Sequence, residues 1–155
     1  MLTTLRDEIK QNKPFESLEQ EAQLNILRTS SLLTDEIEQF LKPYGVTATQ
    51  YNVLRILRGA EPVGLCRNEL RDRMLTRMPD MTRLLDRMEE VGVVARARES
   101  EDRRMVRTRI TAAGLKILSD VDVAMKDEHK RRFRSLDESQ LRTLIELLTI
   151  VRQNE

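Results

Sequence analysis

Residues 76–109 change from a helical pattern of apolar residues to an alternating one, and this change constrains the fold more than any other feature. In the first half, apolar residues recur at spacings of three and four, which places them on one side of a helix. They are Met78, Met81, Leu84, Leu85 and Met88. Gly92 stands where a helix would end, because glycine adopts a left-handed conformation without strain. The pattern predicts a helix with Thr76 as its N-cap, Pro79 in its first turn, and an end near Gly92.

Two short runs of alternating residues follow, at 93–98 and 106–110, and they predict two strands. The residues between them, 99–104, are charged or polar throughout, so we expect them to form an exposed tip. A helix followed by a basic hairpin is the outline of a winged helix, a structure that binds DNA.

Charge is distributed unevenly along a chain that is almost neutral, with 27 basic and 26 acidic residues. Residues 67–109 contain twelve basic residues, all arginine, against nine acidic ones, whereas residues 1–50 contain five basic and eight acidic. The planar guanidinium group fits both phosphate and the edge of guanine. Pairing with neighbouring acids accounts for several of these arginines, but not for a whole basic hairpin.

Composition narrows the class of protein further. Charged residues make up 34% and aromatic residues 3% of the 155 residues, which favours half-exposed helices over an aromatic-rich β fold. The single Cys66 cannot form an internal disulfide. No apolar run approaches the roughly 20 residues of a membrane span, and the acidic N-terminus does not look like a signal peptide. We therefore expect a cytoplasmic protein with no membrane association.

Helix starts are marked by capping patterns, in which a polar residue is followed three residues later by glutamine. These patterns begin at Ser17, Thr47 and Asp137, and Thr111 is a further suitable cap. We predict helices over residues 18–42, 48–57, 67–74 and 112–134, and a last one after Asp137. The short helix at 67–74 and the helix after Thr76 are joined tightly, as in a helix-turn-helix.

The long helices at the two chain ends carry more apolar residues than a winged helix can cover. The economical explanation is a dimer. We expect a mainly α fold in which residues 1–42 and 112–155 form a helical dimerisation region and residues 46–111 form a winged helix-turn-helix lobe with a small β-hairpin wing.

Residues 82–114, TRLLDRMEEVGVVARARESEDRRMVRTRITAAG, resemble the signature of the MarR family of transcriptional regulators. The matching parts are the TRLLDR run, Gly92 with its apolar pair, Arg96, the Asp102-Arg103-Arg104 tip and the Ile110-to-Gly114 segment. The order of elements agrees from about residue 17 to 153. Two departures are Ile110 where leucine is usual, and Met78-Pro79-Asp80 where small hydroxyl residues are common.

This resemblance implies a homodimeric DNA-binding regulator, expected to be a repressor, that binds a palindromic operator in double-stranded DNA. A recognition helix would enter the major groove and a wing would reach toward the minor groove. The residues implied in the helix region are Thr76, Arg77, Asp80, Thr82, Arg83 and Arg87. In the wing, Arg104 would enter the groove beside Arg103, with its guanidinium held by Asp102, while Arg98 would contact phosphate or form an ion pair within the hairpin. Arg96 and Arg107 are either phosphate contacts or ion pairs within the hairpin.

The family resemblance also implies a small aromatic or phenolic ligand that releases the protein from DNA. Its candidate contacts are Phe40, Tyr44 and Tyr51, for which ordinary core packing is the alternative interpretation.

Other functions have less support in the sequence. No phosphate-binding glycine motif or nucleophile elbow indicates an enzyme, and one histidine, His129, indicates neither a metal site nor another cofactor. Cys66 is better explained as a structural thiol than as a redox sensor. The main alternative is a helical homodimeric protein-interaction module without sequence-specific DNA binding, which a DNA-binding assay would distinguish.

Overall fold

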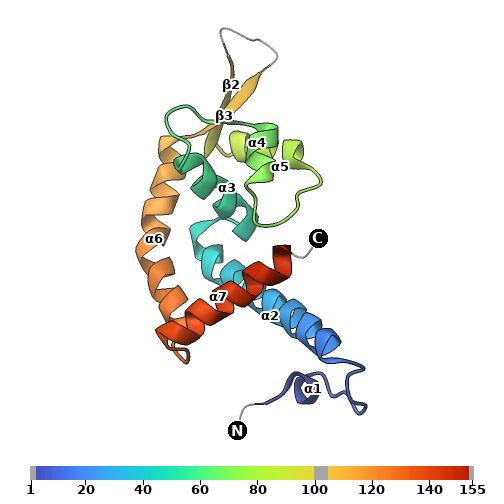
Figure 1. Cartoon of the computed structure of the whole chain (residues 1–155). Helices are drawn as coiled ribbons and strands as arrows, with labels where there is room; N and C mark the ends of the chain where they lie inside the picture. Colours follow the sequence, from blue (N-terminus) through green and yellow to red (C-terminus); the bar gives the residue numbers. More distant parts are fainter. Residues whose placement is uncertain (1–2, 100–104, 154–155) are drawn as a thin grey trace. The chain divides into compact units, whose positions relative to one another are not determined.

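The computed structural model describes residues 3–99 and 105–153 (Figure 1). The chain forms two compact units, residues 1–51 and residues 52–155. Helices make up most of the described chain and one small antiparallel sheet completes it, so the predicted mainly α fold class is confirmed. None of the helices in the described ranges is both long enough and apolar enough to cross a bilayer.

The N-terminal unit contains α1 (Leu5–Glu8), α2 (Leu18–Leu41), a 3-10 turn η1 (Lys42–Tyr44) and the start of α3 (Ala48–Arg58). Two predicted caps explain where the longer helices begin. The Ser17 hydroxyl accepts a hydrogen bond from the Gln20 amide at 3.1 Å. Thr47 and Gln50 bond reciprocally, at 3.1 Å and 3.0 Å, as in a complete capping box.

The C-terminal unit holds the rest of α3 and the sheet with its helices. Its further elements are β1 (Leu65–Cys66), α4 (Arg67–Asp72), α5 (Met81–Glu90), β2 (Val94–Arg98), β3 (Val106–Ile110), α6 (Ala112–Arg132) and α7 (Glu138–Gln153). The strands lie in the order β1-β3-β2, with Thr108 of β3 opposite both Leu65 and Arg96. The two predicted strands are confirmed, whereas β1 was not predicted.

The predicted apolar side of α5 faces the core of this unit. Met81, Leu85 and Met88 are buried there, together with Leu70 of α4 and Val94 of β2. Burial of three side chains on a ten-residue helix fixes its rotation about its axis, so its polar residues are left on the opposite side.

The start of α5 differs from the prediction. The helix begins at Met81 with Asp80 as its N-cap, whose side chain accepts from the Arg83 amide at 2.9 Å. Thr76 therefore is not the cap, and Thr76 and Arg77 belong to the connection after α4. The physical reason is Pro79, because its ring disfavours a helical conformation at the preceding Met78.

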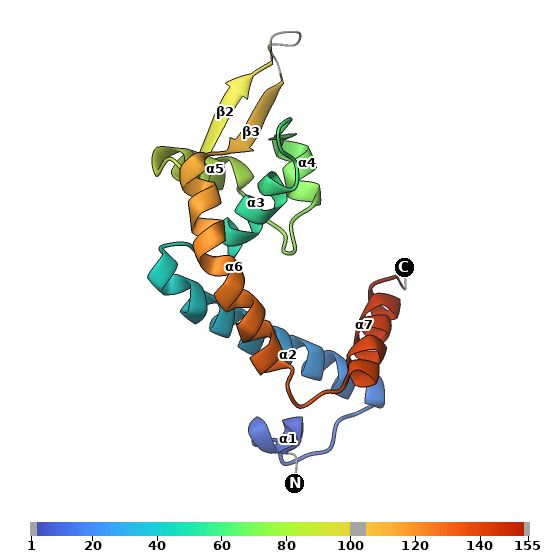
Figure 2. The same cartoon turned by 90° about the vertical axis from the view of Figure 1, so that its left-hand side faces the viewer.

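The hairpin is attached directly to the first turn of α6, and Figure 2 shows β2 and β3 extending away from that end of the helix. The Thr111 hydroxyl donates to the Gly92 carbonyl at 2.7 Å and accepts from the Gly114 amide at 3.2 Å. A Cβ atom at Gly114 would lie 2.4 Å from the carbonyl oxygen of Val93, so only glycine permits this close packing.

The last helix, α7, contrasts with α6. Asp137 and Gln140 form the predicted reciprocal cap before it, with both hydrogen bonds at 2.9 Å. No side chain of α7 is buried. Its exposed apolar residues are Leu144, Ile145, Leu147, Ile150 and Val151.

Candidate nucleic-acid interface

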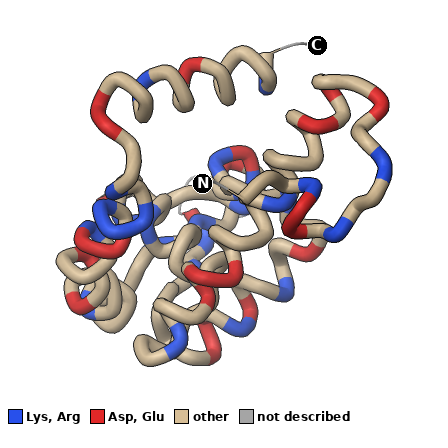
Figure 3. Tube along the Cα trace, turned by 90° about the horizontal axis from the view of Figure 1, so that it is seen from below, with Lys and Arg blue, Asp and Glu red and all other residues tan. Residues whose placement is uncertain are grey.

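Basic and acidic residues are interspersed along the chain rather than gathered in separate elements (Figure 3). Local pairing therefore decides which arginines can meet an external anion. Four of the predicted site arginines are exposed and have no carboxylate partner among residues 3–99 and 105–153. They are Arg77, Arg83, Arg87 and Arg98.

The outer side of α5 brings three predicted residues together. Because Met81, Leu85 and Met88 face inward, Thr82, Arg83 and Arg87 are exposed on the helix. Asp80 is used as the N-cap, so its carboxylate holds the start of this helix. The arrangement presents two guanidinium groups one helical turn apart, a spacing that places them on the same side.

Thr76 and Arg77 lie before α5, in the connection from α4. Both are exposed. This connection is attached to α3, because the Asn52 side-chain oxygen accepts from the Leu75 amide at 2.9 Å. The structure thus separates the predicted helix residues into one group on α5 and another in the preceding connection.

Arg96 attaches the hairpin to α5. Its Nη2 atom donates to Asp86 at 2.6 Å and to Glu89 at 2.7 Å, and its backbone amide donates to Glu89 at 2.9 Å. The hydrogen bond to Glu89 is the main cause that raises the pKa of Arg96, and the bond from Arg96 lowers the pKa of Glu89. Of the two interpretations of Arg96, the ion pair is the one present in the structure.

Arg107 has a similar structural role nearer the tip of the hairpin, where it lies opposite Ala97. It pairs with Glu99 at the end of β2 and lies 3.3 Å from Glu69 of α4. The hydrogen bond to Glu99 raises its pKa. Arg109 donates to the Val63 carbonyl at 3.1 Å, which joins β3 to the segment before β1. These three arginines hold the lobe together, and the charges of Arg96 and Arg107 are paired with carboxylates.

The predicted wing tip lies outside the described residues. Asp102, Arg103 and Arg104 fall between residues 99 and 105, so their roles remain predictions.

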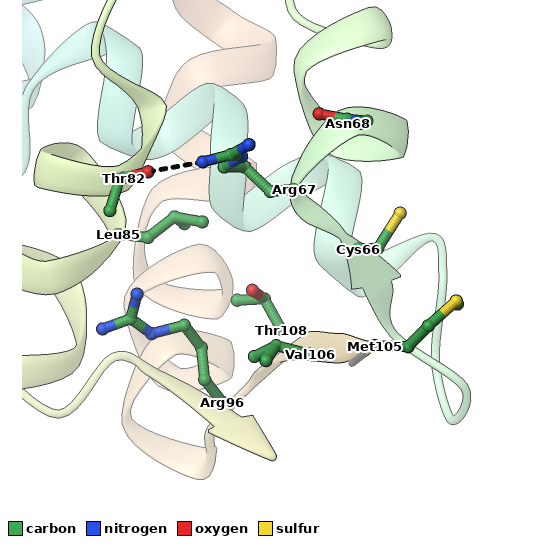
Figure 4. Close-up of a pocket in the computed structure, with 9 residues that line it drawn as sticks. All are labelled: Cys66, Arg67, Asn68, Thr82, Leu85, Arg96, Met105, Val106 and Thr108. Carbon is green, nitrogen blue, oxygen red and sulfur yellow. Dashed lines mark hydrogen bonds between the residues drawn. The ribbon is translucent and has the colours of Figure 1, made fainter. Parts of the chain in front are cut away.

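A cleft of about 410 Å³ opens between α4, α5 and the sheet (Figure 4). Arg67 and Asn68 line it from α4, and Arg67 Nη1 donates to the Thr82 hydroxyl at 3.0 Å. Neither α4 residue was predicted from the sequence as part of the site. One local signal marks the start of the helix that carries them, because Glu69 follows Cys66 at capping-box spacing. In the structure, the Glu69 carboxylate accepts a hydrogen bond from the Cys66 amide at 2.8 Å, and this bond fixes the start of α4.

The predicted ligand residues lie in the N-terminal unit. Phe40 and Tyr44 are half-buried, and their rings contact each other at a centroid distance of 5.8 Å. Tyr51 is buried. Among the described residues, no three histidine, cysteine, aspartate or glutamate side chains are arranged to hold a metal ion.

Comparison with known proteins gives a consistent result. A model of the MarR family matches residues 44–105. The crystal structure of a MarR transcription factor from Planctomyces limnophilus is 37% identical and has a TM-score of 0.66, covering 88% of this chain and 99% of that one. The HTH-type transcriptional repressor IacR of Pseudomonas putida is 26% identical over 83% of this chain and 76% of its own length. A mutant of MarR from E. coli, solved in complex with operator DNA, has a TM-score of 0.73 at 24% identity and covers 96% of this chain and 99% of that one, a likeness of fold.

Proposed function

Because the chain belongs to the MarR family of DNA-binding transcriptional regulators, we propose that it binds a palindromic operator as a homodimer and acts as a repressor. The observation that carries the proposal is the outer side of α5, where Arg83 and Arg87 are exposed without carboxylate partners among the described residues. MarR proteins regulate transcription and are not a family of enzymes, and we propose no catalytic activity for this chain.

Reading of bases is assigned to α5. A recognition helix lies in the major groove with its N-terminal part against base edges. Arg83 and Arg87 would bond to guanine or to phosphate, with Thr82 beside them. Thr76 and Arg77 would contact DNA from the connection before the helix, and Arg98 would contact phosphate from the hairpin.

For the wing tip, we propose the arrangement that the resemblance to the MarR family implies. Arg104 would enter the minor groove beside Arg103, and Asp102 would hold its guanidinium group. The ion pairs of the hairpin strands support this assignment, because Arg96 and Arg107 attach the two strands that carry the tip to α5 and α4.

Dimerisation is assigned to residues 1–42 and 112–155, and DNA binding to residues 46–111. Exposed apolar side chains on α2 and α7 support this division, among them Leu18, Leu27 and Ile145. A second copy would cover them and place two α5 helices on successive major grooves.

We further propose that a small aromatic or phenolic ligand releases the protein from DNA. Phe40, Tyr44 and Tyr51 are the proposed contacts, and the adjacent rings of Phe40 and Tyr44 support the first two. The proposed site of action is the cytoplasm, where a bacterial-type regulator meets its operator.

The test is selection of bound sequences from random duplex DNA. We expect inverted repeats whose half-sites lie about one helical turn, ~10 base pairs, apart. With six to ten phosphate contacts, the affinity should fall roughly 10³–10⁵-fold between 50 and 200 mM salt. Binding without preference for inverted repeats would contradict the proposal. A complete lack of DNA binding by a stable dimer would favour the alternative of a helical protein-interaction module.

A further inference from the structure

The cleft between α4, α5 and the sheet contains polar groups in addition to the two arginines that would read bases from α5 (Figure 4). Arg67 and Asn68 enter it from α4, Thr82 from the first turn of α5 and Thr108 from the middle strand. These residues come from three elements that are far apart in the sequence, so only the folded C-terminal unit brings them together.

Arg67 and Arg96 both line the cleft, but they differ in charge balance. Arg96 is bonded to two carboxylates, those of Asp86 and Glu89, which neutralise it. Arg67 is exposed, and its one hydrogen-bond partner in the described chain is the neutral hydroxyl of Thr82. The cleft therefore has one guanidinium group whose charge is balanced by none of the described carboxylates.

Thr108 adds a further polar group to the wall of the cleft. Its side chain is almost fully buried, with 1% exposure, and its hydroxyl points into the cleft (Figure 4). Within the described ranges no group forms a hydrogen bond with this hydroxyl. A hydroxyl group on the wall of a cleft can bond to water or to an oxygen atom of a ligand. The cleft is thus suited to a polar, oxygen-rich group.

We propose that this cleft binds one phosphate group of the DNA backbone, with the Arg67 guanidinium and the Asn68 amide as donors. This inference rests on the proposed operator binding and adds an anchor that is independent of base sequence. A guanidinium group matches phosphate oxygens with two parallel hydrogen bonds. The major groove is bordered by two phosphate backbones, so residues beside a recognition helix are the ones that meet them.

Thr82 is a positioning residue in this arrangement. Its hydroxyl accepts from Arg67 at 3.0 Å and holds the guanidinium group in one place relative to α5. An ordered side chain loses less conformational entropy when it binds, which favours affinity. The anchor and the base-reading side of α5 would then approach the DNA as one unit.

The experiment uses the full-length protein and its selected operator. Each phosphate of one half-site is replaced in turn by an uncharged methylphosphonate, and Kd is measured at one fixed salt concentration. For the wild type, we expect one position in each half-site at which replacement weakens binding roughly 10-fold or more. Arg67→Ala should bind the unmodified operator as weakly as the wild type binds the modified one, and should show no further loss at that position.

Arg67→Ala should also weaken binding to all sequences alike, and it should reduce the slope of log K against log salt by about one per subunit. Arg71→Ala is the matched control, since Arg71 is an exposed arginine of the same helix and lies 3.7 Å from Asp72. This control should keep the methylphosphonate-sensitive position. Arg67→Gln, with a thermal melt of each variant, separates lost contact from lost folding.

Thr82 is tested by a pair of substitutions. Thr82→Val keeps the side-chain shape but removes the acceptor, so it should reduce the effect of the sensitive methylphosphonate. Thr82→Ser keeps the acceptor and should restore the wild-type pattern.

Three outcomes would overturn the inference. If no phosphate position distinguishes the wild type from Arg67→Ala while the wild type binds its operator, the cleft assignment fails and the proposed function stands. If the wild type binds no duplex, both fail. If inorganic phosphate binds the DNA-free protein through Arg67 but no backbone position is sensitive, the cleft takes a free anion and not DNA.

Discussion

Two amphipathic helices of the C-terminal unit, α5 and α7, have similar spacings of apolar residues and different surroundings. On α5 the apolar side is covered by the lobe, and Leu85 is 2% exposed. On α7 the corresponding side is open, and Ile145 is 63% exposed. The polar sides differ as well, because α5 presents arginines without carboxylate partners among the described residues, whereas Arg142 of α7 pairs with Glu138 at 2.6 Å.

The difference shows what a helical pattern determines. It specifies which residues share a side, but the rest of the molecule determines what covers that side. We therefore expect α5 to contribute to the stability of a single chain and to DNA binding, and α7 to contribute to association between chains. Each prediction below tests one part of this contrast.

The largest effect is expected for Leu85→Ala on α5. Removing a side chain that is 2% exposed leaves a cavity, which should lower the free energy of unfolding by ~2–5 kcal/mol. Urea unfolding followed by circular dichroism measures this change. The control is Ile145→Ala on α7, which should have little effect at protein concentrations low enough to keep the chain monomeric. Equal losses of unfolding free energy in the two variants would contradict the contrast between the buried side of α5 and the exposed side of α7.

A charge on α7 should act on association instead. Ile145→Asp would place a carboxylate in the proposed dimer interface, and we expect the dimer dissociation constant to rise by roughly 30-fold or more. Analytical ultracentrifugation over a range of concentrations gives the constant. Glu146→Gln, at the neighbouring exposed residue, should leave it unchanged. An unaltered dimer in Ile145→Asp would exclude this side of α7 from the interface.

On α5, Arg87 and Arg96 should separate DNA binding from stability. Arg87→Ala should weaken operator binding by ~1–3 kcal/mol and leave the unfolding free energy unchanged, because its charge has no carboxylate partner among the described residues. Arg96→Ala should cost about 1 kcal/mol of stability, since it removes hydrogen bonds to Asp86 and Glu89. Fluorescence anisotropy and urea unfolding on both variants measure the two quantities. An equal loss of stability in the two variants would show that pairing with carboxylates does not distinguish structural arginines from DNA-binding ones.

The smallest expected effect is on acid stability. The pKa of Glu89 is lowered from 4.5 by its bond to Arg96, so the folded state binds its proton less readily than the unfolded state does. The stabilisation is complete above pH 4.5 and is lost as the pH falls through the lower folded pKa. Because the Glu89 side chain is 39% exposed, the loss should stay below about 1 kcal/mol. Unfolding of the wild type and Glu89→Gln between pH 7 and 3.5 tests this, since the variant should lack this part of the pH dependence.

Local signals in the sequence predicted most of the fold. The caps at Thr47 and Asp137 are formed by residues three positions apart, so the helix starts could be identified without knowing the tertiary structure. The predicted start of α5 was wrong, because Thr76 and Asp80 are both suitable caps. The effect of Pro79 on the conformation of Met78 decides between them. The strand β1 has two residues, too few to show alternation.

The candidate site was less predictable, because its contacts join residues from different elements. Arg67 and Thr82 are 15 positions apart, and no periodic pattern relates them. The choice between phosphate contact and ion pair for Arg96 depended on Asp86 and Glu89, which reach β2 only after α5 has packed on the sheet.

Gly114 has a mechanical consequence. The absence of a side chain there lets the first turn of α6 rest against the Val93 carbonyl and Ile110, at the base of the hairpin. With 21 residues, α6 is about 30 Å long. A helix of this length that packs tightly against the hairpin at one end moves with it as a rigid body. A small tilt imposed at its far end would be transmitted to the wing without any flexible joint between them.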